Sequence, residues 1–234
     1  MKLPRLSRRS GFTLVELLTV IAIIGILAAM IIPGVQLVRK KAQKLAASNN
    51  CQNIAKAYNA FAFGSATARN ITENNVSTNG GGVTGWAVYL AAKAGLNEPN
   101  VWFIKTDERL GQVTNWPKKI ADITDPSKPV VDGDFQNAQP KSWAVVVNAP
   151  KNDNNATSYP IVWTRGLSGT TWEQDSPWGK EGGHVAFMDG HVVEIESTVD
   201  EGSGKGVFTN YKTKKETSSI QEAIGDSAKI LEDK

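Results

Sequence analysis

Residues 1–40 read MKLPRLSRRSGFTLVELLTVIAIIGILAAMIIPGVQLVRK, and this stretch decides the fold. The 22 residues from Leu17 to Val38 carry no charge. As a helix they extend about 33 Å, which is enough to cross a hydrocarbon core of about 30 Å. Glu16 stands at the start of this apolar run. Because a carboxylate in the middle of a bilayer costs about 2.5–3.5 kcal/mol, Glu16 predicts a positively charged partner.

A short basic leader precedes the apolar run. Ordinary secretory signals are cleaved after their apolar core, whereas the small and polar residues here, Ser10 and Gly11, come before it. Cleavage at this place leaves the apolar helix on the mature protein. Basic residues flank the run on both sides, so the positive-inside rule does not decide its orientation.

The leader is followed by Gly11-Phe12-Thr13-Leu14-Val15-Glu16-Leu17-Leu18, with Gly25 and Pro33 further along. This pattern resembles the N-terminus of type IV prepilins and type II secretion pseudopilins. The resemblance implies that a prepilin peptidase cuts between Gly11 and Phe12 on the cytoplasmic side, and that Phe12 is then N-methylated. It also implies that Glu16 pairs with the freed amine of a neighbouring subunit during filament assembly.

The same resemblance implies further properties of the chain. The protein is expected in a bacterial inner membrane as a single-pass protein, with its N-terminus inside and its head outside the cytoplasm. Its expected partners are pilin-like subunits and an inner-membrane assembly platform. Pro33 removes one backbone hydrogen bond and favours a kink that neighbouring helices can compensate in a filament. The plainer alternative places Glu16 at the headgroup level of a simple membrane anchor.

We expect an α+β protein in five parts: a cleaved leader (1–11), a transmembrane and assembly helix (12–38), an amphipathic stalk helix (39–63), an α+β head (64–199) and a polar C-terminal tail (200–234). The stalk carries a helical stripe of Ala47, Cys51, Ile54, Tyr58 and Phe61, which predicts a buried face. The single cysteine, Cys51, cannot form an intrachain disulfide and is expected in the core.

Residues 64–85 are rich in Asn, Thr and Gly and predict an exposed loop, whereas residues 85–95 predict a short helix ended by Gly95. Short apolar runs beyond Pro99 predict an antiparallel sheet. These runs are Val101–Ile104, Trp143–Val147, Ile161–Thr164, Val185–Met188 and His191–Ile195. In the tail, Ser219 and Glu222 predict the start of a short helix.

Residues 183–192 read GHVAFMDGHV and predict a hairpin with Asp189 and Gly190 as a two-residue turn. The end of this segment resembles an Asp-Gly-His-Val signature of a prepilin-like group, whose longer motif has a histidine where this chain has Gly179. In the predicted register Met188 faces His191 and His184 faces Ile195. The two histidines then lie about 13 Å apart and cannot share a zinc ion.

Charge and motifs argue against several function classes. The formal net charge is +3, and removal of the four leader cations leaves 22 basic and 23 acidic residues, so no nucleic-acid partner is predicted. The sequence contains neither a nucleophile elbow nor a phosphate-binding loop, so no enzyme activity is predicted. No cofactor is expected. The resemblance to type II pseudopilins, whose major class holds calcium in a C-terminal loop, implies a weaker alternative, a calcium site at Asp175, Asp189 and Asp200, although their spacing does not specify a calcium loop.

The sequence therefore predicts a structural subunit that polymerises through its N-terminal helix into a type II secretion or type IV pilus-like filament. The alternative is a binding module on a monomeric anchor that holds a glycan or an exported substrate. Seven tryptophans bear on this alternative, because they form either a carbohydrate-stacking face or part of the core and of subunit contacts; the core is favoured, since aromatic side chains bury large areas.

Overall fold

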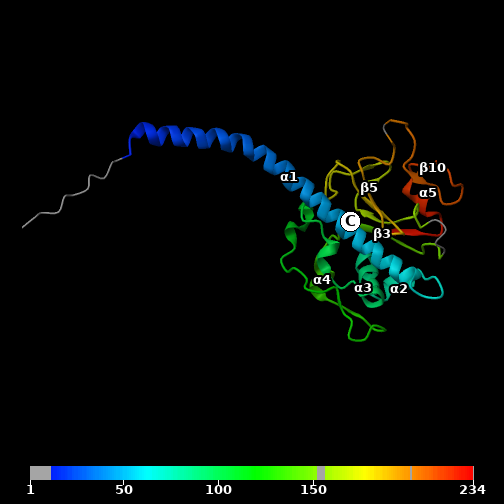
Figure 1. Ribbon diagram of the computed structural model, residues 1–234. Helices are drawn as coiled ribbons and strands as arrows, with labels where there is room; N and C mark the ends of the chain where they lie inside the picture. Colours follow the sequence, from blue (N-terminus) through cyan, green and yellow to red (C-terminus); the bar gives the residue numbers. More distant parts are fainter. Residues whose placement is uncertain (1–11, 152–155, 201, 234) are drawn as a thin grey trace, which may run out of the picture. The chain divides into compact units, whose positions relative to one another are not determined.

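The computed structural model describes residues 12–151, 156–200 and 202–233 (Figure 1). The chain divides into two compact units, Met1–Ala42 and Gln43–Lys234. The helices are α1 (Leu14–Phe63), α2 (Glu73–Ser77), α3 (Gly82–Ala94), α4 (Gly133–Asn137) and α5 (Ile220–Ile224), with the 3-10 helices η1 (Pro99–Trp102) and η2 (Glu108–Gln112). The strands are β1 (Ala121–Asp122), β2 (Val130–Val131), β3 (Trp143–Val147), β4 (Pro160–Thr164), β5 (Leu167–Ser168), β6 (Thr171–Trp172), β7 (Gly183–Phe187), β8 (Val192–Ile195), β9 (Phe208–Thr209), β10 (Glu216–Thr217) and β11 (Lys229–Leu231).

The long N-terminal helix is confirmed, and its second half forms part of the head. The five residues of the predicted stalk stripe are all buried, because one face of α1 covers the sheet. Cys51 lies in this interface, with its sulfur 3.9 Å from the carbonyl oxygen of Val162 in β4. Tyr58 stacks on Trp86 of α3 with ring centroids 5.7 Å apart. The helix therefore supplies the core of the head as well as the apolar N-terminal segment.

The head is built around a five-stranded antiparallel sheet in the order β11-β3-β4-β7-β8. Every residue of β3, β4 and β7 is buried, as expected for strands covered on both faces. The indole nitrogen of Trp86 donates to the carbonyl oxygen of Val146 at 2.9 Å, which ties α3 to β3. An antiparallel sheet after a long helix confirms the predicted α+β class.

The apolar run Val101–Ile104 does not form the strand that its composition predicts. Pro99 starts the 3-10 helix η1 instead, and the residues after it are irregular but buried. Side chains replace ladder bonds: the indole nitrogen of Trp143 donates to the carbonyl oxygen of Val101, and the amide of Ile104 donates to the hydroxyl of Ser142. Because side chains satisfy the backbone here, this apolar run is buried without strand pairing.

The segment 64–85 is an exposed loop only in its first part. Thr72 and Asn75 form a capping box that starts α2, and Val76 is buried. Helix α3 begins at Gly82, earlier than predicted. Gly85 lies so close to the end of α2 that a Cβ atom would meet the carbonyl oxygen of Val76 at 2.2 Å. The glycines here therefore allow close helix packing, where composition alone indicates a loop.

The expected tail, 200–234, is part of the head. Its last strand, β11, pairs with β3, with Ile230 opposite Val146. The predicted helix is present as α5, and the Ser219 hydroxyl accepts from the amide of Glu222. The hydroxyl of Tyr159 donates to the carbonyl oxygen of Ile224 at 2.9 Å, so α5 is held against the sheet. An edge strand of only three residues leaves no clear pattern in a polar segment, so the sequence did not predict β11.

The register of the β7–β8 hairpin differs by one residue from the predicted one. Ala186 pairs with Val192 and His184 with Glu194, so the loop has three residues, Met188 to Gly190. The amide of Met188 donates to the carbonyl oxygen of Tyr159, and Met188 is buried. Gly190 has a φ of 93°, the left-handed position typical of three-residue hairpin loops.

A buried ion pair links the irregular segment after η1 to the end of β4. The Arg165 guanidinium donates to the Asp107 carboxylate at 2.6 and 3.2 Å, and both side chains are 1 % exposed. The hydroxyl of Ser142 also donates to this carboxylate. Asp175 lies 3.7 Å from Arg165 and 3.0 Å from Arg109. Loss of one partner therefore leaves a charge buried and poorly compensated.

We predict that Asp107→Asn lowers the free energy of unfolding by about 3 kcal/mol, because Arg165 loses its nearest counter-charge. Urea unfolding of the full chain in mild detergent, followed by tryptophan fluorescence, measures the change. Asp122→Asn is the matched control, because Asp122 and its partner Lys119 are both exposed, and it is expected to change stability much less than Asp107→Asn. Equal effects of the two substitutions would contradict a structural role for the buried pair.

Candidate functional site

Thr13 and Glu16 form a capping box at the start of α1. The amide and the hydroxyl of Thr13 donate to Oε2 of Glu16 at 2.8 and 2.7 Å, and the amide of Glu16 donates back to the threonine hydroxyl at 3.2 Å. This arrangement satisfies helix-end donors and fixes the carboxylate. Since a carboxylate has about four acceptor positions, Glu16 still has acceptor capacity for a further donor.

The first part of α1 exposes a continuous apolar surface. Phe12, two residues before the helix, is 77 % exposed, and most of the large apolar side chains up to Val38 are also exposed. Within the described residues, α1 is the only helix long and apolar enough to span a membrane. Such a surface needs lipid or other helices around it, since exposed apolar patches of this size are rare in soluble monomers.

Comparison with family models supports the same region. Residues 6–32 match the prokaryotic N-terminal methylation motif. The N-terminal region therefore carries a motif consistent with a type IV prepilin-like protein. Comparisons with curated proteins and with solved structures give no match. The motif implies processing by a prepilin peptidase and a structural subunit of pilin-like assemblies, and together with α1 it fits a single-pass inner-membrane protein.

The structure describes only some of the residues predicted to act in processing and assembly. Gly11, on the leader side of the expected cut, lies outside the described residues, whereas Phe12 and Glu16 are described. Helix α1 continues through Pro33, and the kink expected there stays a prediction. Cleavage before Phe12, its methylation and the intermolecular pairing of Glu16 likewise stay predictions.

The Asp-Gly-His segment of the head forms a well-fixed hairpin tip. Oδ1 of Asp189 accepts from the amide of His191 at 3.0 Å and lies 2.6 Å from its ring nitrogen Nδ1. The His191 ring stacks on Phe187 at 4.4 Å. Asn59 of α1 donates to the carbonyl oxygen of Met188, so the tip is held on the helix. Asp189 is thus placed as a turn residue.

The two histidines do not form a shared site. His184 pairs with Glu194, whereas the amide of Phe187 donates to the carbonyl oxygen of His191. Positions 184 and 187 are an odd number apart along β7, so the two histidines lie on opposite faces of the hairpin. His184 is buried, and this burial lowers its pKa. The predicted register separates the two histidines along one face of the hairpin, whereas the observed register places them on opposite faces. In neither register can they share a metal ion.

The calcium alternative receives no support from the aspartates. Asp175 is engaged by Arg109 and Arg165, and Asp200 accepts two hydrogen bonds from Ser203. Asp189 is occupied by His191. Among residues 12–151, 156–200 and 202–233, no group of three or more His, Cys, Asp and Glu side chains is arranged to hold a metal ion.

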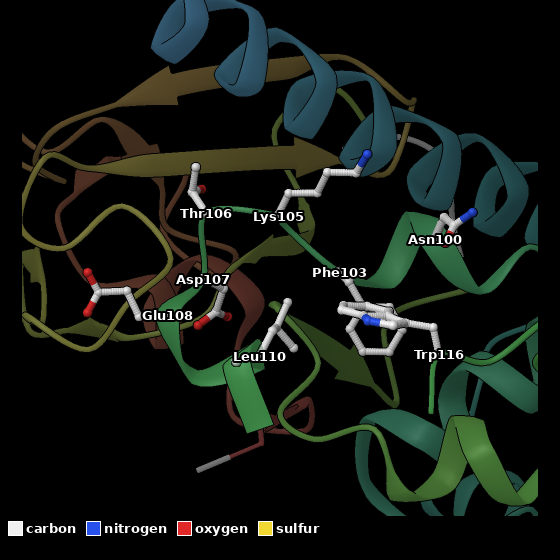
Figure 2. Close-up of a pocket in the computed structure, with 9 residues that line it drawn as sticks. Asn100, Phe103, Lys105, Thr106, Asp107, Glu108, Leu110 and Trp116 are labelled. Atoms are coloured by element: carbon white, nitrogen blue, oxygen red, sulfur yellow. The ribbon is translucent and has the colours of Figure 1, made fainter. Parts of the chain in front are cut away.

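A cavity of about 550 Å³ lies beside the loop that follows η1 (Figure 2). Trp116, Phe103 and Leu110 provide its apolar lining. Trp116 is 50 % exposed and meets Phe103 edge to face, with ring centroids 5.5 Å apart. The other six tryptophans are at most 8 % exposed, so the predicted core role holds for them. The sequence signal for this site is a tryptophan in the segment Asn-Trp-Pro-Lys-Lys (115–119), which contains no other large apolar residue. On sequence alone, Trp116 was not separated from the other tryptophans.

Lys141 is a second feature that the sequence reasoning missed. Its side chain is fully buried, its Nζ donates to the carbonyl oxygen of Ala138 at 2.7 Å, and it lies 4.6 Å from the ring centroid of Phe135. Burial lowers the pKa of the Lys141 ammonium to about 8, partly opposed by the nearby Asp233 carboxylate. The folded head therefore releases this proton at a lower pH than the unfolded chain does.

We predict that the wild type gains stability relative to Lys141→Met as the pH rises from 7 to 10. Between the folded pKa of about 8 and the unfolded value near 10.5 the unfolded chain binds the extra proton, so unfolding becomes harder with rising pH. The gain approaches about 1.4 kcal/mol per pH unit in this window. Urea unfolding at several pH values measures the difference. The exposed control Lys118→Met should show a flat difference; a flat difference for Lys141→Met would refute the assignment.

Proposed function

We propose that this prepilin-like chain is a filament subunit of a type II secretion pseudopilus or a related type IV pilus. The observation that carries the proposal is the methylation motif at residues 6–32, whose part from Leu14 onward lies on α1 and has an exposed apolar surface. In the proposed cycle a prepilin peptidase cuts between Gly11 and Phe12, Phe12 is methylated, and the exposed helices pack together. The protein then acts by assembling, without turnover of a substrate.

Electrostatics supports the role proposed for Glu16. Cleavage converts the peptide nitrogen of Phe12 into an amine, and methylation leaves its positive charge in place. In an apolar surrounding an ammonium and a carboxylate attract strongly at short range, and each otherwise has a high desolvation cost. The Thr13 hydrogen bonds fix the carboxylate of Glu16 while leaving it able to accept more. A neighbouring amine therefore both neutralises Glu16 and sets the axial register of the helices.

The proposed orientation places the N-terminus in the cytoplasm and the head outside it. This orientation follows from cleavage by the peptidase on the cytoplasmic side, because the flanking basic residues do not decide it. An inner-membrane assembly platform would receive the processed subunit. A head held together without disulfides fits this proposal, since its buried core and the Asp107–Arg165 pair stabilise it.

Processing of the N-terminus can be tested by mass analysis. When the chain is produced in cells with a prepilin peptidase, intact-mass analysis of membrane-extracted protein should show a chain that starts at Phe12 and carries one added methyl group. The same cells without the peptidase are the control, and they should yield the chain with its leader. A chain that keeps its leader in peptidase-competent cells would count against the proposal.

The role of Glu16 in assembly can be tested by substitution. Glu16→Ala should enter the membrane normally but assemble at least about tenfold less, since it loses a charge pair worth more than about 1.4 kcal/mol. Glu16→Asp, which keeps the charge, should assemble better than Glu16→Ala. Leu18→Ala is the matched control, because it removes an exposed side chain of the same helix without a charge. Sedimentation of sheared filaments measures assembly, and normal assembly of Glu16→Ala would contradict the pairing.

Crosslinking separates this proposal from a monomeric anchor. A photoreactive residue in place of Ile24, which is exposed on α1, should yield crosslinks between copies or to other pilin-like subunits. A monomeric anchor that carries a binding head would yield lipid adducts alone at this position. The cavity at Trp116 is the observation that favours a binding function for the head.

A further inference from the structure

The cavity beside η2 combines an apolar floor with a polar rim. Figure 2 shows Phe103 and Trp116 next to each other, with Leu110 beside them. Phe103 and Leu110 are buried, whereas half of Trp116 is exposed. Because the other described tryptophans are buried in the core, Trp116 is an exception that core packing does not explain. The volume of about 550 Å³ lies within the range of about 300–1,000 Å³ typical of small-molecule sites.

Three exposed polar side chains line the same cavity: Asn100, Lys105 and Glu108. They bring an amide, an ammonium and a carboxylate, and none has a hydrogen-bond or ion-pair partner among the described side chains. Two further polar residues line the cavity. The buried hydroxyl of Thr106 has no hydrogen-bond partner among the described residues, whereas Asp107 is already neutralised by Arg165. Free donors and acceptors around an aromatic floor can fix the orientation of a ligand.

The charges of the rim indicate what kind of ligand fits. Lys105 and Glu108 have opposite charges, so the rim favours neither an anion nor a cation. A purely apolar ligand would leave the three polar side chains without new partners. A sugar ring matches both parts, because one of its faces consists of C–H bonds and its edge carries hydroxyl groups. Its apolar face can lie on Trp116 while its hydroxyls bond to the rim.

We propose that this cavity binds a neutral oligosaccharide, with Trp116 as the stacking platform and Asn100, Lys105 and Glu108 as hydrogen-bonding groups. The proposal concerns the head alone and does not depend on polymerisation. In a filament it would give each subunit a glycan-binding site. On a monomeric anchor it would give the head its ligand.

The test uses the full chain in lipid nanodiscs, because detergents with sugar headgroups would compete for the site. Cellohexaose, maltohexaose and chitohexaose are titrated separately by calorimetry. At least one should bind saturably, and Trp116→Ala should weaken that binding about tenfold or more. Trp116→Phe, which keeps an aromatic ring, should retain more of the binding than Trp116→Ala. Glu108→Gln, which keeps a hydrogen-bonding group, should also retain more of the binding than Trp116→Ala.

Val130→Ala is the control, because Val130 is exposed on the head but does not line the cavity. It should bind like the wild type. Unfolding by urea checks that each variant is folded. Absence of saturable binding to all three sugars would overturn the proposal, and so would equal binding by Trp116→Ala. If only the apolar dye anilinonaphthalene sulfonate bound, in a manner that depends on Trp116, the cavity would be an apolar docking site and the glycan assignment would be wrong.

Discussion

A carboxylate at the entrance of an apolar helix is the constraint on which the account of this protein depends. Glu16 precedes 22 uncharged residues, and within the part of the chain that the structure describes its carboxylate accepts two hydrogen bonds, both from Thr13. These neutral donors fix the position of the carboxylate but do not cancel its charge. Residues after Glu16 expose apolar side chains around the helix, so the counter-charge has to come from outside them. The methylation motif supplies a candidate, the amine of another subunit.

Helix α1 serves two environments with one secondary structure. Up to Val38 its large side chains are apolar and exposed, which suits lipid or other helices. From Ala47 to Phe61 only one face is buried, and this face forms the core of the head with β4 and α3. The change from an all-round apolar surface to a single apolar stripe therefore divides α1 into an exposed apolar segment and a head segment. A single element thereby carries both an exposed apolar surface and part of the core of the head.

The sequence predicted those parts of the fold whose signals are local. Helical spacing from Ala47 to Phe61, the Gly95 helix end and the run Trp143–Val147 each depend on neighbouring residues, and the structure contains all three elements. Contacts between distant residues decided the parts that were wrong. The amide of Met188 donates to the carbonyl oxygen of Tyr159, and with this bond the hairpin has a register one residue away from the predicted one. The three-residue strand β11 is recognisable only from its pairing with β3.

The same division holds for the candidate sites. The N-terminal motif could be recognised from the sequence because its residues lie within one short stretch, 6–32, whereas the roles of Gly11, Phe12 and Glu16 stay predictions. The cavity could not be recognised in this way, because Phe103, Leu110 and Trp116 come together through an irregular loop without periodicity. Asp107 and Arg165 are 58 residues apart, and neither carries a local signal for burial.

Pairing between Glu16 and the Phe12 amine is tested by an intermolecular distance in the native assembly. Filaments are assembled from a mixture of ¹³C-labelled and ¹⁵N-labelled subunits, so that solid-state NMR detects only carbon–nitrogen contacts between different copies. The account predicts a contact between the side-chain carboxyl carbon of Glu16 and the terminal nitrogen of Phe12, at about 4 Å as in an ion pair. Filaments without this contact, or a chain that remains monomeric after processing, would contradict it.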